Sequence, residues 1–96
     1  MKQEQAKILI VDDEKTLCET LSEVLREEGY ETATAFDGDQ AIELIEKNKF
    51  DVIFCDLRMP KLDGIKVLEK TEEISPDTFF IVMTAYGSME TTLEAL

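Results

Sequence analysis

Hydrophobic and polar residues alternate along this chain with two different periods. Short, almost unbroken apolar runs predict buried β-strands, whereas apolar residues that recur every three or four positions predict amphipathic helices. Strands are expected at residues 7–11, 30–35, 51–56 and 78–85. A helix is expected after each strand: over 14–28, from Asp37 onward, around 65–74, and from Ser88 to the last residue.

Turn and capping residues separate these segments. Gly29 follows the first helical pattern directly, as a glycine that ends a helix does. Asp37, with Gln40 three residues later, has the spacing of a capping box. Alternating strand and helix units with apolar central strands predict an α/β fold, a doubly wound parallel sheet covered by helices on both faces.

Length and composition narrow the class of protein. Ninety-six residues with 44% hydrophobic content fit one folded domain, 1–96. A formal charge of −12 argues against nucleic acid or an anionic membrane as a partner of this segment, and favours cations and basic protein surfaces. The first residues lack the apolar core of a signal peptide and no apolar run is long enough to span a membrane, so a cytoplasmic location is expected.

The reactive residue types are few. Cys18 and Cys55 each lie in an apolar periodic stretch, which predicts two buried thiols in a reducing compartment. The chain contains no histidine, so histidine-based catalysis and histidine-rich metal sites are excluded. A phosphohistidine carried by this chain is excluded for the same reason.

Three acids and one hydroxyl lie near the ends of predicted strands. Asp12 and Asp13 follow the first strand, Asp56 ends the third, and Thr84 lies near the end of the fourth. In open parallel sheets, sites form at the carboxyl ends of the strands, so these side chains would face one crevice if the first and third strands are neighbours. A simpler role for Asp13 is to favour the N-terminus of the next helix. That role does not explain Asp56, because no helix begins directly after it.

Carboxylates that share a crevice need a cation to offset their repulsion. Oxygen ligands without histidine or cysteine select a hard ion, and Mg²⁺ keeps several waters while binding one or two carboxylates. A Mg²⁺ ion in such a crevice would also neutralise phosphoryl oxygens, so the arrangement suits phosphoryl transfer to a carboxylate. An ATPase of the Walker type is disfavoured, because the sequence lacks the G-x-x-x-x-G-K-[ST] loop.

Three stretches, "ILIVDDE", "DVIFCDLRMPKLDG" and "IVMTAYGS", resemble the receiver (response regulator) domain of two-component signalling. They occur in the order and spacing of that family and span the chain. The resemblance implies the flavodoxin-like strand order 2-1-3-4-5. The last stretch, "MTAYGSMETTLEAL", looks most like receivers of bacterial enhancer-binding transcription activators of the nitrogen-regulation type.

The resemblance also implies a role for each residue. Asp56 would be the phosphoacceptor and Thr84 the switch hydroxyl that moves toward the phosphoryl group. Asp13 would bind Mg²⁺ directly, Asp12 mainly through water, and the backbone carbonyl of Arg58 would be a further ligand. The phosphoryl donor would be a phosphohistidine on a sensor histidine kinase. In the full-length protein an output domain, expected to control transcription, would follow.

The resemblance is incomplete at the C-terminus. Receivers continue through a fifth strand that ends in a lysine and through a fifth helix, whereas this sequence stops at Leu96. We therefore expect an incomplete receiver, with strands 1–4 and helices 1–4 present and without the lysine that would pair with the phosphoryl group. Strand 78–85 would then be an apolar edge, left open by truncation or filled by a second copy in a homodimer or swapped oligomer.

Three function classes follow from these observations. The first is a phosphoacceptor domain, which is a switch and not a turnover enzyme. The second is a pseudo-receiver or interaction module that folds alike without being phosphorylated, an alternative that the missing lysine keeps open. The third, a Mg²⁺-dependent phosphohydrolase, is disfavoured because such enzymes typically need a carboxylate two residues after the nucleophile, where this chain has Arg58.

Overall fold

Strands and helices alternate through the part of the chain that the computed structural model describes, residues 5–57 and 64–83. The elements are, in order, β1 (Lys7–Val11), α1 (Lys15–Glu27), β2 (Glu31–Ala35), α2 (Gly38–Lys47), β3 (Val52–Asp56), α3 (Gly64–Ile74) and β4 (Phe79–Met83). The bounds agree with the predicted segments to within a few residues. The helix predicted from Ser88 lies outside the described residues.

The strands form one parallel sheet in the order β2-β1-β3-β4. This confirms the doubly wound arrangement and the neighbouring placement of β1 and β3. The register aligns Val11 of β1 with Cys55 of β3, so Asp12 and Asp56 follow side by side at the carboxyl end of the sheet. Among the described strands, β2 and β4 are the two outer ones.

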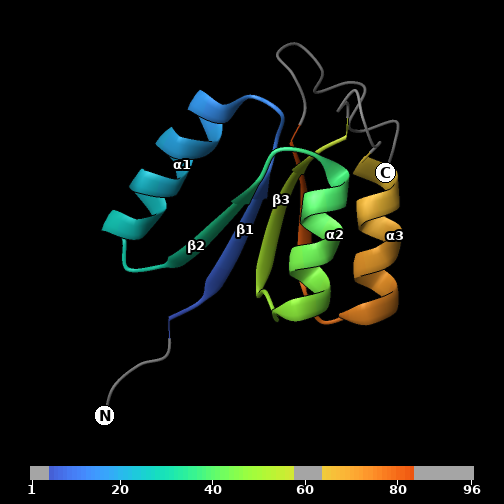
Figure 1. Cartoon of the computed structure of the whole chain (residues 1–96). Helices are drawn as coiled ribbons and strands as arrows, with labels where there is room; N and C mark the ends of the chain where they lie inside the picture. Colours follow the sequence, from blue (N-terminus) through green and yellow to red (C-terminus); the bar gives the residue numbers. More distant parts are fainter. Residues whose placement is uncertain (1–4, 58–63, 84–96) are drawn as a thin grey trace.

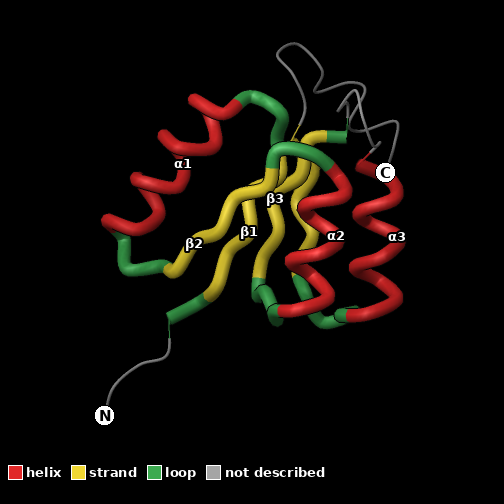
Figure 2. Tube along the Cα trace, viewed as in Figure 1, coloured by secondary structure: helices red, strands yellow, loops and turns green. Residues whose placement is uncertain are grey.

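Helices cover both faces of the sheet. In Figure 1, α1 lies on one side of the sheet and α2 and α3 lie together on the other, and Figure 2 shows the same three layers. The core is divided accordingly. On the side of α2 and α3 the buried residues include Leu9, Val11, Ile53, Cys55 and Val67, and on the side of α1 they include Ile8, Ile10 and Cys18.

The helix ends follow the predicted capping chemistry, with one difference. The Asp37 side chain accepts a hydrogen bond of 2.8 Å from the backbone N–H of Gln40, as expected for an N-cap. The Gln40 side-chain oxygen, however, accepts from the backbone N–H of Phe36 at 2.8 Å, one residue before the N-cap. Gly29 has φ +99°, and its N–H donates to Arg26 while that of Tyr30 donates to Leu25, which closes α1 in a Schellman motif.

The burial of α1 differs from the helical pattern of its apolar residues. Leu17 and Val24 are 41% and 51% exposed, whereas Ser22 is buried. The hydroxyl of Ser22 lies 2.6 Å from that of Thr32, so a polar contact with β2 joins this helix to the sheet. The orientation of α1 is therefore set partly by this hydroxyl pair.

The outer strand β4 carries exposed apolar side chains. Phe79 is 72% exposed and Ile81 is 43% exposed. This agrees with the prediction of an apolar strand at the edge of the sheet. Among the described residues, the longest and most apolar helices still fall short of what a membrane span requires.

Candidate functional site

Three of the predicted acids meet at the carboxyl end of β1 and β3. One carboxylate oxygen from each of Asp12, Asp13 and Asp56 lies within 4.8 Å of the others. Asp12 is buried, Asp13 is exposed and Asp56 is intermediate, so the cluster lies at a surface with one carboxylate held inside. The three acids therefore lie close together, as their places at the strand ends predicted.

Backbone and side-chain contacts hold Asp12 in place. Its N–H donates to the carbonyl of Ala35 at 3.1 Å, which continues the β1–β2 ladder by one residue. One of its carboxylate oxygens accepts from the N–H of Glu14 at 2.9 Å, and the thiol of Cys18 donates to its carbonyl at 3.3 Å. The link from Cys18 was missed in the sequence, because an apolar periodic position does not indicate a contact six residues back.

The electrostatic environment of Asp12 is unfavourable for a negative charge. Burial raises the pKa of this carboxyl above its ordinary value, and the charges of Asp56 and Asp13 raise it further. The hydrogen bond from the Glu14 N–H lowers this pKa more than the charge of either neighbouring acid raises it, but less than burial does, so the pKa stays raised. A bound cation would relieve this repulsion and desolvation.

The start of α3 approaches the end of β3 closely. A Cβ atom placed on Gly64 would lie 2.7 Å from the carbonyl oxygen of Asp56 and 2.7 Å from the Cα of Leu57. Both contacts are with backbone, which cannot move aside as a flexible side chain could. This close approach gives the physical reason for a glycine at position 64.

The donor set fits a hard divalent cation. All three groups are carboxylates, the ligand type that Mg²⁺ prefers, and the described residues bring no histidine or cysteine sulfur into the cluster. Two other predicted site residues, Arg58 and Thr84, lie outside the described residues. Thr84 directly follows Met83, the last residue of β4, whose strand pairs with β3.

Comparison with known proteins decides the family. The response regulator receiver domain matches this chain over residues 8–96. The chain belongs to this family. It is therefore a receiver domain of the two-component response regulators, and the assignment made from its motifs is confirmed.

Curated relatives place this receiver among regulatory proteins. It is 42% identical over 96 residues to the transcriptional regulatory protein ZraR of Klebsiella oxytoca. The match covers all of this chain and 22% of that protein. It is 38% identical over 89 residues to the sporulation initiation phosphotransferase F of Bacillus subtilis, covering 93% of this chain and 72% of the relative. The sequence thus corresponds to about a fifth of the length of the first relative.

Solved receiver structures share the fold. The response regulator TrrA of Thermotoga maritima, solved in complex with Mg²⁺ and BeF, is 34% identical and superposes with a TM-score of 0.82. The match covers 95% of this receiver and 79% of that chain. Both the architecture and the family predicted from the sequence are therefore confirmed.

Proposed function

We propose that this receiver accepts a phosphoryl group on Asp56 in the presence of Mg²⁺ and passes the signal to an output domain that controls transcription. The observation that carries the proposal is the meeting of Asp12, Asp13 and Asp56 within 4.8 Å at the carboxyl end of the central strands. Three acids so placed are costly without a cation, and a cation placed among them makes a phosphoryl site. The TrrA complex with Mg²⁺ and BeF supports this use of the fold.

Asp12 and Asp13 would have different roles in Mg²⁺ binding. Asp13, which is exposed, would coordinate the ion directly, while the buried Asp12 would act mainly through water. The backbone carbonyl of Arg58 would complete the protein ligands. When bound, Mg²⁺ supplies positive charge that offsets the phosphoryl oxygens and the acids around them.

The transfer step places Asp56 as the nucleophile. One of its carboxylate oxygens forms a bond to phosphorus as the phosphorus–nitrogen bond of the donor phosphohistidine breaks. The electron pair of that bond returns to the imidazole nitrogen of the sensor histidine kinase. The product is an aspartyl phosphate, and no turnover of a separate substrate is involved.

Thr84 would convert this modification into a conformational change. Its hydroxyl would donate a hydrogen bond to a phosphoryl oxygen and favour a minor conformation of the segment after β4.

We further propose that this signalling takes place in the cytoplasm, and that the receiver, residues 1–96 of this sequence, is one unit of a longer regulator.

A receiver that folds alike without accepting phosphate is the competing function. It predicts that the acids serve only folding or partner binding. Mg²⁺ with acetyl phosphate, a small phosphoryl donor, separates the two functions without any knowledge of the kinase. We expect the intact mass to increase by one phosphoryl group with Mg²⁺ and to stay unchanged when EDTA removes the ion.

Two variants with the same chemical change sharpen this test. Asp56→Asn should abolish the mass increase. Asp51→Asn should preserve it, because Asp51 lies before β3, at the opposite end of the strand, and is exposed. Equal phosphorylation of Asp56→Asn and the unchanged protein would rule out Asp56 as acceptor, and the absence of phosphorylation in all three would favour the pseudo-receiver.

A further inference from the structure

The strand β2 forms one edge of the sheet, remote from β4. In the described part of the chain no strand lies beyond it. The N–H of Glu31 donates to the carbonyl of Ala6, directly before β1, and the carbonyl of Ala35 accepts from the N–H of Asp12, directly after β1. Since successive residues of a strand direct their backbone groups to opposite sides, the N–H and C=O groups of Thr32 and Thr34 point toward the open edge. These groups could form main-chain hydrogen bonds with an added strand.

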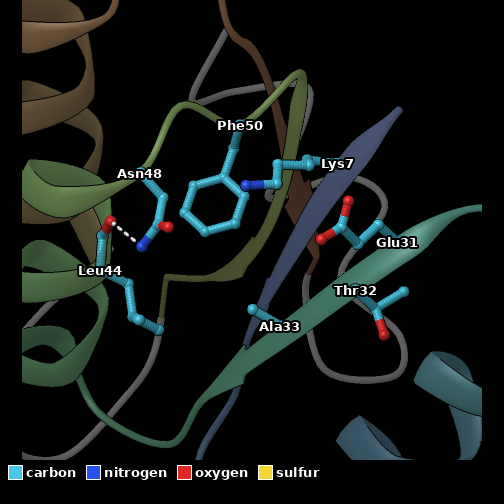
Figure 3. A pocket seen from close by; sticks show the side chains of 7 residues that line it. All are labelled: Lys7, Glu31, Thr32, Ala33, Leu44, Asn48 and Phe50. Carbon is cyan, nitrogen blue, oxygen red and sulfur yellow. Dashed lines mark hydrogen bonds between the residues drawn. The ribbon is translucent and has the colours of Figure 1, made fainter. Parts of the chain in front are cut away.

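An apolar hollow lies beside this edge on the side of α2. Its volume is about 200 Å³. Figure 3 shows Leu44, Asn48 and Phe50 on one side of the opening and the β1 and β2 residues on the other. Its apolar lining comes mainly from Ala33, Leu44 and Phe50, with Lys7 and Glu31 as charged members. The small side chain of Ala33 leaves this space unfilled.

A polar hollow lies beside the same strand on the side of α1. Its volume is also about 200 Å³, and Ser22 and Thr34 line it together with Glu19, Glu23 and Arg26. The four α1 residues lie at positions i, i+3, i+4 and i+7, so they form one stripe of the helix that faces β2. The two hollows therefore flank one strand, one apolar and the other polar with two acids.

A strand added to β2 would use both hollows. Its successive side chains would point to opposite faces, which places one residue in the apolar hollow and its neighbour in the polar one. We propose that the β2 edge is a docking site for an extended segment of a partner protein in which apolar and basic residues alternate. Main-chain hydrogen bonds to Thr32 and Thr34 would give affinity, and the two hollows would give specificity.

Charge favours a basic partner over a second copy of this chain. Pairing two copies through β2 would bring Glu31 and the glutamates of α1 near their own duplicates, on chains that each carry a net charge of −12. Like charges placed opposite each other destabilise strand pairing. In the polar hollow Glu19 and Glu23 outnumber Arg26, so a lysine or arginine of the partner would meet a lining that is negative in sum.

The test uses a capped hexapeptide that alternates valine and lysine, titrated into the ¹⁵N-labelled 96-residue protein. A peptide of the same composition, with its valines and lysines in two blocks, is the control for charge alone. We expect the alternating peptide to shift amide signals of residues 19–26, 31–35 and 44–50, and to bind about tenfold or more tightly than the block peptide. Equal binding of both peptides, or shifts centred elsewhere, would overturn the proposal.

A backbone variant tests the ladder itself. Thr34→Pro removes an N–H that points outward and should leave the pairing with β1 intact, since proline is tolerated on the outer side of an edge strand. It should weaken peptide binding about tenfold, whereas Thr34→Val should change it less than about twofold. Unchanged binding by a folded Thr34→Pro protein would contradict the proposal. If that protein does not fold, a peptide N-methylated at alternate residues replaces it and should bind as weakly.

Paired charge variants test the polar hollow. Changing Glu19 and Glu23 together to glutamine should weaken binding of the alternating peptide severalfold. The same change at Glu69 and Glu72, which are exposed on α3, should leave binding within about twofold because the net charge alters equally at a distance from β2. Equal loss in both double variants would show binding through overall charge and would overturn the assigned site.

Discussion

Asp12 is buried and has two acidic neighbours, so its negative charge is costly in the folded protein. Its folded-state pKa is raised, first by burial and then by the charges of Asp56 and Asp13. Between the unfolded and the folded pKa the folded protein therefore binds more protons at this group. Its contribution to stability falls as pH rises through that window and stays unfavourable at neutral pH.

Replacing this charge should stabilise the protein without Mg²⁺. Asp12→Asn keeps an oxygen that can accept from the Glu14 N–H, yet removes the buried charge. We expect a higher Tm than that of the unchanged protein at pH 7 in EDTA, and a smaller difference near pH 4. Thermal melts at the two pH values measure this, and a lower Tm at pH 7 would contradict the electrostatic account.

The two thiols should be unreactive in the folded protein. Burial raises the pKa of Cys18 to about 11 and that of Cys55 to about 12, so the reactive thiolate is scarce at neutral pH. Alkylation by iodoacetamide at pH 8 should therefore be slow until the protein is unfolded in guanidinium. Rapid modification of either cysteine without denaturant would show that the core around β1 and β3 opens more readily than its packing implies.

At the scale of elements, the contact between the end of β3 and the start of α3 links the packing of α3 to the position of Asp56 in the site. The absence of a side chain at Gly64 lets α3 begin against the backbone of Asp56 and Leu57. Gly64→Ala should cost about 1–3 kcal/mol, as forced overpacking does, and should weaken Mg²⁺ binding by displacing Asp56. Denaturant melts and Mg²⁺ titrations measure the two effects.

A matched control is available in the helix that follows. Lys66 is exposed near the start of α3, so Lys66→Ala changes a residue of this helix without altering its contact with β3. It should leave both stability and Mg²⁺ binding nearly unchanged. If Gly64→Ala behaves like Lys66→Ala, the close approach does not constrain the site.

The elements themselves were predictable because their signals are local. The apolar run of β1, the Gly29 stop of α1 and the Asp37 cap of α2 each depend on residues close in sequence. The exposure of Leu17 and Val24 was not predictable, since it depends on how α1 rests on the sheet. The hydrogen bond between the hydroxyls of Ser22 and Thr32, which helps to orient α1, joins residues ten positions apart and has no periodic signature.

The candidate site was predictable only in part. Acids at adjacent strand ends indicated where Asp12, Asp13 and Asp56 would meet, once parallel strands were expected. The strand order and the separate roles of these acids came from resemblance to the receiver family, because spacing alone does not distinguish a ligand from a nucleophile. The unfavourable environment of Asp12 depends on burial, which only the folded structure supplies.

At the scale of the whole molecule, negative charge links folding to cation binding. The chain carries a net charge of −12, and three of its acids converge at the carboxyl ends of the central strands β1 and β3. An ion that binds only the folded state stabilises it by mass action, by about 2.7 kcal/mol at a concentration of 100 times Kd. We expect Mg²⁺ to raise Tm in a saturable manner.

Sodium at equal ionic strength is the control for this effect, because it screens the charges without occupying a divalent site. Asp13→Asn should lose most of the Mg²⁺ effect and keep the sodium effect. Equal stabilisation by both ions would mean that general screening, and not a defined site, accounts for the response.

The central claim is that Asp56 receives the phosphoryl group. Borohydride reduces an aspartyl phosphate to homoserine, which peptide mapping by mass spectrometry can place at a single residue. After treatment with acetyl phosphate and Mg²⁺, we predict homoserine at position 56 and none at Asp12 or Asp13. Homoserine at another acid, with Asp56 unmodified, would contradict the account.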